Sequence, residues 1–277
     1  MTSSIIASLL LVRMEIIGID IETKSGADLS RTGVYKYVED PEWEIQLFGY
    51  SVDSGEVRQV DLTKGEKIPP EIIDALQDKN VAKYAHNCSF ERINLSRFLG
   101  MPSGTYIDPE GWYCTLVSSA YNGLPRSLKD VGAALKLTEQ KLEDGKDLVR
   151  LFSVPRKPTK KNPARWNQPS DYPDEWARYK AYNIRDVEVE DKLREVLELP
   201  PESEWINYWN NERINDRGVL IDQTLAESAI ELDSIVYDGL MNELQMLTGL
   251  ENPNSPKQLK EWLTNQGVVT DTLGKDT

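Results

Sequence analysis

The order of the patterns along the chain restricts its fold more than any other feature, because strand patterns come first and helical patterns follow. Apolar runs typical of β-strands cover residues 14–21, 45–52, 57–62 and 81–85. Helices are predicted to begin at Pro69–Pro70 and to cover residues 88–99, 112–121, 127–137 and 173–198. This order predicts an α/β fold with a mixed β-sheet flanked by helices.

Length and proline placement divide the chain. At about 150 residues per domain, 277 residues suggest one large domain or two small ones. Residues 150–170 hold four prolines and six basic residues but no acidic residue, which predicts a loop. Pro200–Pro201 ends the last long helix of the first part, and the pattern beyond it is helical. We expect a leader over residues 1–13, a domain over 14–200 and a helical segment over 201–277. The alternative for the leader is a first strand that begins earlier.

Charge and cysteine content narrow the class of protein. The net charge of −14 argues against a uniformly basic surface that wraps nucleic acid, but it allows a local basic strip or a carboxylate site. Two cysteines are too few for a disulfide framework, which favours a reducing interior such as the cytoplasm. The apolar run Ile5–Val12 is far shorter than a membrane span, so no membrane association is expected.

Two acidic residues leave the end of the first predicted strand. Asp20 and Glu22 alternate with Ile19 and Ile21, so the two carboxylates share one face of the strand. Adjacent buried carboxylates are costly unless a cation binds them, and Mg²⁺ or Mn²⁺ prefers such oxygen ligands. The alternative is a strand end with two solvated acids.

A second polar cluster, His86–Glu91, lies where the fourth strand passes into a helix. Asn87 is a plausible helix cap, whereas the functional interpretation has Glu91 facing a metal and Asn87 and Phe90 lining a pocket. His86 is the chain's single histidine, so most histidine-based zinc sites are excluded. A structural role for His86 remains as plausible as acid–base catalysis.

The third cluster lies within the long predicted helix. Tyr182 and Asp186 are four residues apart and therefore share a helix face. A tyrosine hydroxyl beside a carboxylate can hold a water molecule near a metal. The alternative is an amphipathic helix with a buried tyrosine and a surface aspartate.

In combination, these clusters resemble the motifs of the proofreading 3′→5′ exonucleases of the ribonuclease-H-like superfamily, in the DnaQ-like group that ends in tyrosine (DEDDy). Asp20-Ile21-Glu22-Thr23 resembles the first motif, His86-Asn87-Cys88-Ser89-Phe90-Glu91 the second, and Tyr182-Asn183-Ile184-Arg185-Asp186 the third. The segment 122–130 is similar to the region between the last two motifs. Glu91 is a departure, because the second motif usually ends in aspartate.

The resemblance implies a two-metal hydrolysis that removes nucleoside 5′-monophosphates from the 3′ end of single-stranded DNA. It implies two Mg²⁺ or Mn²⁺ ions held by four carboxylates, with Asp20 as the bridge: Asp20, Glu22, Glu91 and Asp186. Tyr182 is expected to orient the attacking water. Thr23 and Phe90 are expected to contact the last nucleotide, and Asn87 to bind its sugar–phosphate or to brace the motif.

The C-terminal region extends the resemblance. Residues 212–222 and 254–259 are similar to the start of the polymerase region of family-A DNA polymerases, especially phage and prophage types, where such helices lead into the thumb. The chain is therefore expected to be a ribonuclease-H-like domain followed by a partial all-α thumb segment. A palm is not expected within this chain, so polymerase activity is not expected from it. The remaining polymerase domain is the expected protein partner.

Basic residues near the third motif offer a second contact with the DNA strand. Trp166 is positioned to stack on a base, and the loop's basic side chains to meet phosphates: Arg150, Arg156, Lys157, Lys160, Lys161 and Arg165. A solvated linker is the alternative. The aromatic residues Trp205, Tyr208 and Trp209 are expected to pack against the first domain. Two other functions stay open: an inactive binding module, and a free-standing nuclease that trims RNA or DNA.

Overall fold

The computed structural model describes residues 14–138, 145–160, 163–270 and 272–274. The predicted leader, residues 1–13, lies outside the described residues. Two compact units form, one up to Gly218 and one from Val219 onward, and each is described by itself. No helix in the described part of the chain is both long and apolar enough to cross a membrane.

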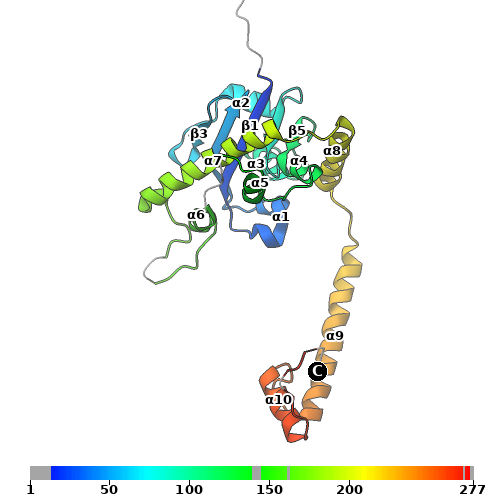
Figure 1. Cartoon of the computed structure of the whole chain (residues 1–277). Helices are drawn as coiled ribbons and strands as arrows, with labels where there is room; N and C mark the ends of the chain where they lie inside the picture. Colours follow the sequence, from blue (N-terminus) through cyan, green and yellow to red (C-terminus); the bar gives the residue numbers. More distant parts are fainter. Residues whose placement is uncertain (1–13, 139–144, 161–162, 271, 275–277) are drawn as a thin grey trace, which may run out of the picture. The chain divides into compact units, whose positions relative to one another are not determined.

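The first unit is built on one five-stranded mixed sheet (Figure 1). The strands are β1 (Ile16–Lys24), β2 (Glu44–Val52), β3 (Arg58–Asp61), β4 (Ala82–Ala85) and β5 (Trp112–Cys114). Their spatial order is β3-β2-β1-β4-β5. β2 pairs antiparallel with β1 and β3, while β4 pairs parallel with β1 and β5. This mixed sheet flanked by helices is the α/β architecture predicted from the sequence.

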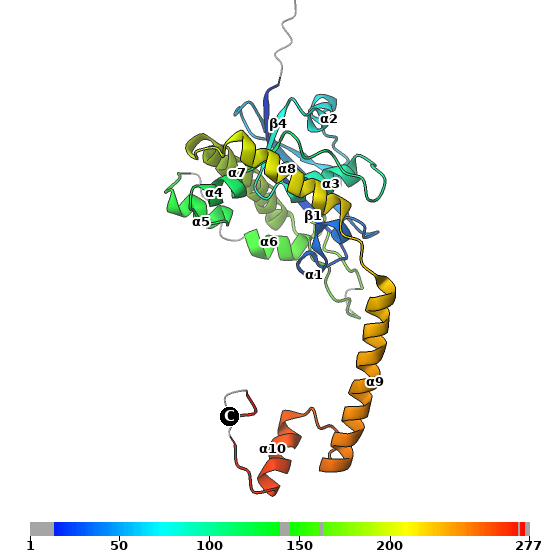
Figure 2. The same cartoon turned by 90° about the vertical axis from the view of Figure 1, so that its right-hand side faces the viewer.

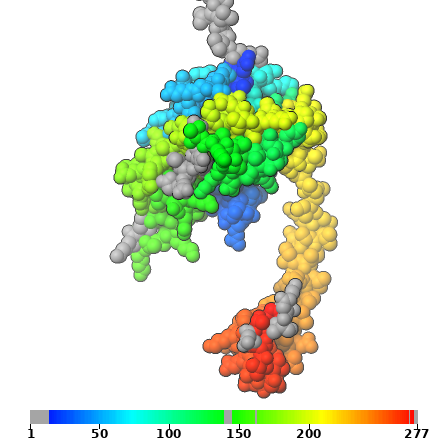
Figure 3. Space-filling view, viewed as in Figure 1, coloured from blue at the N-terminus to red at the C-terminus, as the bar shows by residue number. Residues whose placement is uncertain are grey.

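Helices cover both faces of this sheet. They are α1 (Leu29–Tyr37), α2 (Pro70–Gln77), α3 (Ser89–Phe98), α4 (Thr115–Tyr121), α5 (Leu128–Ala134), α6 (Gly145–Phe152), α7 (Pro173–Val196) and α8 (Glu202–Arg217), with short 3₁₀ turns at Leu62–Lys64 and Pro169–Asp171. In Figure 2 the strands lie between α7 on one side and α2 and α3 on the other. Figure 3 shows α4 and α5 in green beside the yellow-green α7, and contacts of α7 with both helices agree.

The alternation of β1 separates its apolar face from its polar face. Ile17, Ile19 and Ile21 are buried in the core that also contains residues of α2 and α3. Glu22 and its neighbour two residues earlier, Asp20, point to the other face and contact α7. The prediction that both carboxylates share a face, with the isoleucines in the core, is confirmed.

Two glycines let α7 approach the sheet closely. A Cβ at Gly49 would lie 2.6 Å from the side-chain oxygen of Asn183, and Gly49 is the register partner of Asp20. A Cβ at Gly18 would lie 2.7 Å from the Ser51 hydroxyl and 2.8 Å from a carboxylate oxygen of Asp191. Larger residues at these positions would push the helix away from the strand that carries Asp20.

Three elements differ from the sequence predictions. Residues 112–121 were predicted as one helix, but Trp112–Cys114 form strand β5, and only Thr115–Tyr121 are helical. The short strand is stabilised by its pairing with β4 and by Tyr113, which stacks on Tyr84 at 5.1 Å. Helices α1 and α6 were not predicted. A break at Gly33, with φ of 72°, interrupts the periodicity of α1. α6 extends into the predicted loop, because Leu148 and Phe152 are buried against α7.

Helix α8 packs on the first unit. Trp205 is buried in the main core, and Tyr208 and Trp209 pack against it, as predicted for these aromatic residues. The Trp209 indole donates to the Trp112 carbonyl at 2.8 Å, and the Tyr208 hydroxyl lies 3.1 Å from the Cys88 sulfur. The compact unit therefore continues to Gly218, whereas the sequence placed the boundary after residue 200.

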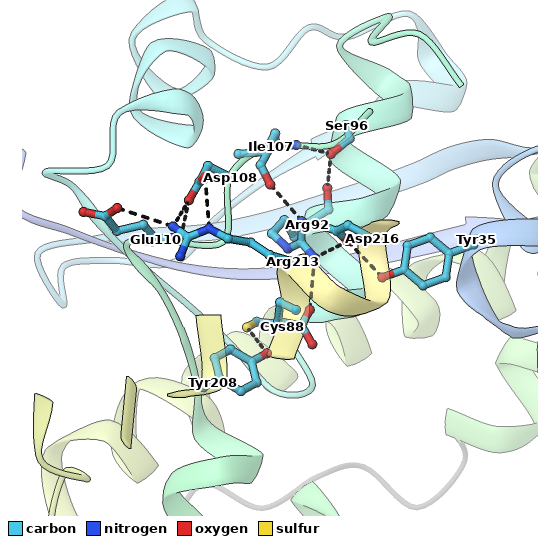
Figure 4. A network of polar contacts seen from close by, with 11 residues as sticks. Tyr35, Cys88, Arg92, Ser96, Ile107, Asp108, Glu110, Tyr208, Arg213 and Asp216 are labelled. Carbon is cyan, nitrogen blue, oxygen red and sulfur yellow. Dashed lines mark hydrogen bonds and ion pairs between the residues drawn. The ribbon is translucent and has the colours of Figure 1, made fainter. Parts of the chain in front are cut away.

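A buried arginine joins α3 to α8 (Figure 4). Arg92 is 1% exposed and donates to both carboxylate oxygens of Asp216 at 2.8 Å and to Glu212 at 3.0 Å. It also donates to the Ile107 carbonyl at 2.8 Å, and the Tyr35 hydroxyl donates to Asp216 at 2.9 Å. α8 is thus held by charged as well as aromatic contacts.

The second unit contains α9 (Gln223–Thr248) and α10 (Pro256–Asn265). Asp222 caps α9 by accepting from the Leu225 amide, and Ser255 caps α10 by accepting from the Gln258 amide. Gly249 ends α9 in the left-handed conformation. The unit is helical, as expected for residues beyond 203.

Candidate active site

The long helix α7 presents one polar face to β1. Tyr179 donates to a carboxylate oxygen of Glu22 at 2.6 Å. The Asn183 amide donates to a carboxylate oxygen of Asp20 at 2.6 Å and to its carbonyl at 3.0 Å. Gln59 on β3 donates to the Asn183 side-chain oxygen at 2.7 Å and fixes the orientation of that amide. The two carboxylates of the first motif are therefore held in place from α7.

Sequence reasoning missed Tyr179, Asn183 and Gln59. A signal for the first two was present, because Tyr179, Asn183, Asp186 and Glu190 recur at helical spacing on one face of α7. All four are buried. No sequence signal indicated Gln59, since its contact with α7 depends on the order of strands in the sheet.

The second motif places Glu91 inside the protein. Glu91 lies in the first turn of α3 and is 4% exposed, and its Oε2 atom has no hydrogen-bond partner. Burial, and then the negative charges of Asp20 and Glu22, raise the pKa of Glu91 well above its ordinary value. Glu91 therefore lies within electrostatic reach of the first-motif carboxylates, and its contact with a metal stays a prediction.

The third motif reaches the same region. Tyr182 is 6% exposed and Asp186 is 3% exposed. Burial, and then the charges of Asp186, Glu22 and Asp20, raise the pKa of the Tyr182 hydroxyl far above its ordinary value. A hydroxyl with so high a pKa keeps its proton at neutral pH and donates a hydrogen bond. Tyr182 thus connects the first and third motifs.

The other predicted residues occupy different surroundings. Asn87 is exposed and adopts a positive φ of 72°. Phe90 is partly buried against Tyr37, with ring centroids 6.1 Å apart. Thr23 is buried, and its hydroxyl pairs with the Tyr37 hydroxyl at 2.8 Å. The expected contacts of these residues with a nucleotide stay predictions.

The predicted basic loop, residues 150–170, begins within helix α6, and two of its later residues contact side chains at the end of β1 and just before β2. Arg165 forms an ion pair with Glu42 at 2.7 Å, and the Trp166 indole donates to the same carboxylate at 3.0 Å. The Lys24 ammonium lies 5.3 Å from the centre of the Trp166 ring. Lys161 lies outside the described residues. Arg165 and Trp166 are therefore engaged within the protein.

The carboxylates fit a divalent cation by their chemistry. Within the residues that the structure describes, no three side chains of His, Cys, Asp or Glu are close enough together to hold a metal ion. The donors at the site are nevertheless all oxygens, and the buried Oε2 of Glu91 has no proton donor. A cation would offset the repulsion that raises the pKa of Glu91.

A hollow of ≈ 670 Å³ opens beside these residues. Its lining includes Asn87 and Tyr182, three basic side chains (Arg126, Lys129 and Lys146) and one acidic side chain, Asp130. This surface combines the second and third motifs with positive charge, although the protein as a whole is acidic. Its charge complements a phosphate backbone.

Gly145, at the start of α6, lets the Tyr182 ring occupy its position. A Cβ at Gly145 would lie 2.0 Å from a ring carbon of Tyr182. Gly145→Ala must therefore displace the ring, and we expect it to lower the rate of the 3′-end hydrolysis predicted from the sequence by about 100-fold, as misplacement by about 1 Å does. The measurement is the rate on a labelled single strand, with Gly132→Ala as control, because a Cβ there meets only a Val189 methyl at 3.8 Å. Equal rates for the two variants would contradict the role of Gly145.

Comparison with known proteins identifies a relative of this chain. No family model matches it. The chain is 43% identical over 266 residues to the DNA polymerase of Bacillus phage SP02, and this match covers 95% of the chain and 40% of that polymerase. The chain is therefore homologous to part of a phage DNA polymerase, which confirms the likeness to phage DNA polymerases predicted from the sequence.

Solved structures show weaker likeness. Brucella melitensis NrnC is 19% identical, with 66% of this chain and 72% of that chain covered and a TM-score of 0.38. Trypanosoma brucei RNase D is 16% identical, with coverages of 75% and 68% and a TM-score of 0.48. Escherichia coli RNase D, described as an exoribonuclease, is 15% identical, with coverages of 75% and 46% and a TM-score of 0.41.

Proposed function

We propose that the chain is a metal-dependent 3′→5′ exonuclease that hydrolyses the terminal phosphodiester of single-stranded DNA and releases nucleoside 5′-monophosphates. The observation that carries this proposal is a set of carboxylates on β1, α3 and α7: α7 donates hydrogen bonds to Asp20 and Glu22, and Glu91 and Asp186 are buried. The homology to a DNA polymerase supports DNA as the substrate and proofreading as the role.

Two Mg²⁺ or Mn²⁺ ions are proposed to be held by four carboxylates: Asp20, Glu22, Glu91 and Asp186. When bound, such ions activate water and neutralise the charge of the reacting phosphate. Asn183 and Tyr179 orient the first two carboxylates through the hydrogen bonds described above. The protonated Tyr182 hydroxyl, beside Asp186, orients the attacking water. Asn87, at the hollow, binds the sugar–phosphate of the last nucleotide.

The basic side chains of the hollow are proposed to receive the approaching strand. Arg126, Lys129 and Lys146 lie on the same surface as Asn87 and Tyr182. A single strand that enters there places its 3′ end next to the carboxylates while its phosphates meet positive charge. This arrangement reconciles a net charge of −14 with a nucleic-acid substrate.

The second unit is proposed to pack against the remaining polymerase domain. In the described part of the chain, neither α9 nor α10 contains a buried residue. Large apolar side chains on α9 are exposed, among them Leu225, Ile230, Ile235, Val236 and Leu240. An exposed apolar surface of this kind is typical of a protein–protein contact.

The test of the proposed function uses single strands labelled at the 5′ end, one of DNA and one of RNA with the same sequence. With Mg²⁺ or Mn²⁺, we expect a ladder of DNA shortened from the 3′ end, no cleavage of circular single-stranded DNA, and no reaction in EDTA. An Asp20→Asn chain purified in parallel controls for contaminating nucleases. Faster degradation of RNA would favour the trimming nuclease, and intact substrates in every arm would favour the inactive binding module.

A further inference from the structure

A chain of three hydrogen bonds lies beside the candidate site and has no part in the proposed chemistry. His86 Nε2 lies 2.8 Å from the Arg126 carbonyl oxygen, and His86 Nδ1 lies 3.1 Å from the Thr115 hydroxyl. The Thr115 hydroxyl lies 3.0 Å from Glu190 Oε1. The contacts join the turn after β4, the start of α4, the segment before α5, and α7. Four elements around the hollow are therefore linked through the single histidine.

The donor and acceptor capacities of these groups determine where the protons of the three hydrogen bonds lie. The Arg126 carbonyl only accepts, so His86 Nε2 carries a proton. The Thr115 hydroxyl has one proton, so it donates to one neighbour and accepts from the other. One further proton is accordingly shared between His86 Nδ1 and the Glu190 carboxyl. With this proton on His86 Nδ1, Thr115 donates to Glu190; with it on Glu190, Thr115 donates to Nδ1. All three hydrogen bonds form in both arrangements, and Nε2 is protonated in each.

Within this series of hydrogen bonds, His86 directly precedes a residue of the proposed substrate site. Asn87 follows His86 directly and adopts a left-handed backbone conformation, with φ of 72°. A non-glycine residue rarely adopts this conformation, so the contacts around Asn87 must hold it there. His86, Asn87 and Arg126 line the same hollow as Tyr182. The hydrogen bonds of His86 therefore hold the backbone that presents Asn87.

We propose that His86 and Thr115 are positioning residues, anchored by Glu190, which fix Asn87 for contact with the terminal nucleotide. The proposal rests on the proposed exonuclease function. It assigns His86 no proton transfer to the substrate, because both ring nitrogens are engaged within the protein. It also gives Glu190 a role apart from the four proposed metal ligands.

Thr115→Val tests this positioning, because it removes the hydroxyl and keeps the shape of the side chain. In the full chain we expect KM for a single-stranded DNA end to rise about fivefold, the effect of one hydrogen bond, while kcat changes by less than about twofold. Thr115→Ser restores the hydroxyl and is expected to restore KM. Thr105→Val is the control, because Thr105 is exposed and its hydroxyl bonds only its own loop, at Pro102. A KM equal to that of the control, or a loss confined to kcat, would overturn the proposal.

Nuclear magnetic resonance supplies a readout that is independent of activity. His86 is the chain's single histidine, so its ring signals are unambiguous in tag-free protein. We expect a protonated Nε2 in the wild type, and in Thr115→Val a shift of the Nδ1 signal together with the Asn87 backbone amide. Ring and amide signals that are unchanged in Thr115→Val would overturn the proposal. Because these signals need no turnover, they decide on the hydrogen-bond chain even if the wild type shows no nuclease activity.

Discussion

Asp20→Asn is expected to lower the rate of 3′-end hydrolysis by about 1,000-fold or more and, at the same time, to stabilise the metal-free chain. Asp20 is the proposed bridge between two cations, and several kcal/mol of charge stabilisation depend on such a ligand, with about 4 kcal/mol corresponding to 1,000-fold. Asparagine keeps the shape of the side chain and still accepts a hydrogen bond from Asn183, which donates to Asp20 at 2.6 Å. The loss of activity is therefore electrostatic rather than structural.

The expected gain in stability follows from the direction of a pKa shift. Burial, and then the charge of Asp20, raise the pKa of Glu91 well above its ordinary value of 4.5. The folded chain therefore binds this proton more tightly than the unfolded chain, so the free energy of unfolding without metal falls as the pH rises above about 4.5. Glu190, whose pKa is raised by burial and then by Glu91 and Asp20, adds to this fall. Asp20→Asn removes one of the charges responsible.

Both expectations are measured on the same preparations. Unfolding is followed in EDTA at pH 5 and pH 8, and hydrolysis is followed with Mg²⁺ and Mn²⁺. Asp74→Asn on α2 is the matched control, because this aspartate is exposed on a helix outside the proposed site. We expect Asp20→Asn to show a smaller loss of stability between the two pH values than the control. Retained hydrolysis, or a variant less stable than the control at pH 8, would contradict the electrostatic account.

The parts of the site that were predictable depend on local periodicity. Strand alternation placed Asp20 and Glu22 on one face of β1, and helical spacing placed Tyr182 and Asp186 on one face of α7. The first turn of α3 placed Glu91 by the same local argument. Each of these statements needs only the period of a single element. The resemblance to the exonuclease motifs then supplied the expectation that these side chains converge.

The parts that were missed depend on how elements fit together. The bonds from Tyr179 to Glu22 and from Gln59 to Asn183 require the position of α7 against three strands, which no single period encodes. That position depends on Gly49, whose missing side chain leaves room for Asn183. β5 escaped prediction for a related reason, because its three residues are too short for a periodic pattern and owe their conformation to pairing with β4.

Arg92→Met is expected to lower the free energy of unfolding by about 3–5 kcal/mol, the cost of removing one partner from a buried ion pair. Arg92 is 1% exposed, and its removal leaves the carboxylate of Glu212, itself 5% exposed, without its counter-charge. Asp216 would lose two hydrogen bonds and keep the one from Tyr35. Restoring neutrality with Glu212→Gln in the same chain is expected to recover part of the loss.

The measurement is urea unfolding of the full chain, followed by tryptophan fluorescence, since Trp205 and Trp209 report on α8. Arg97→Met is the control, because Arg97 lies on the same helix but is exposed, and such a change shifts stability by no more than about 0.5 kcal/mol. Equal midpoints for the two variants would mean that the network does not hold α8.

The contacts of Arg92 also bear on where the first domain ends. A chain cut after residue 200 would lack Glu212 and Asp216, the partners of Arg92. Arg92 is one residue from the proposed ligand Glu91. The proposed nuclease domain is therefore expected to need α8, up to Gly218, to keep α3 in place.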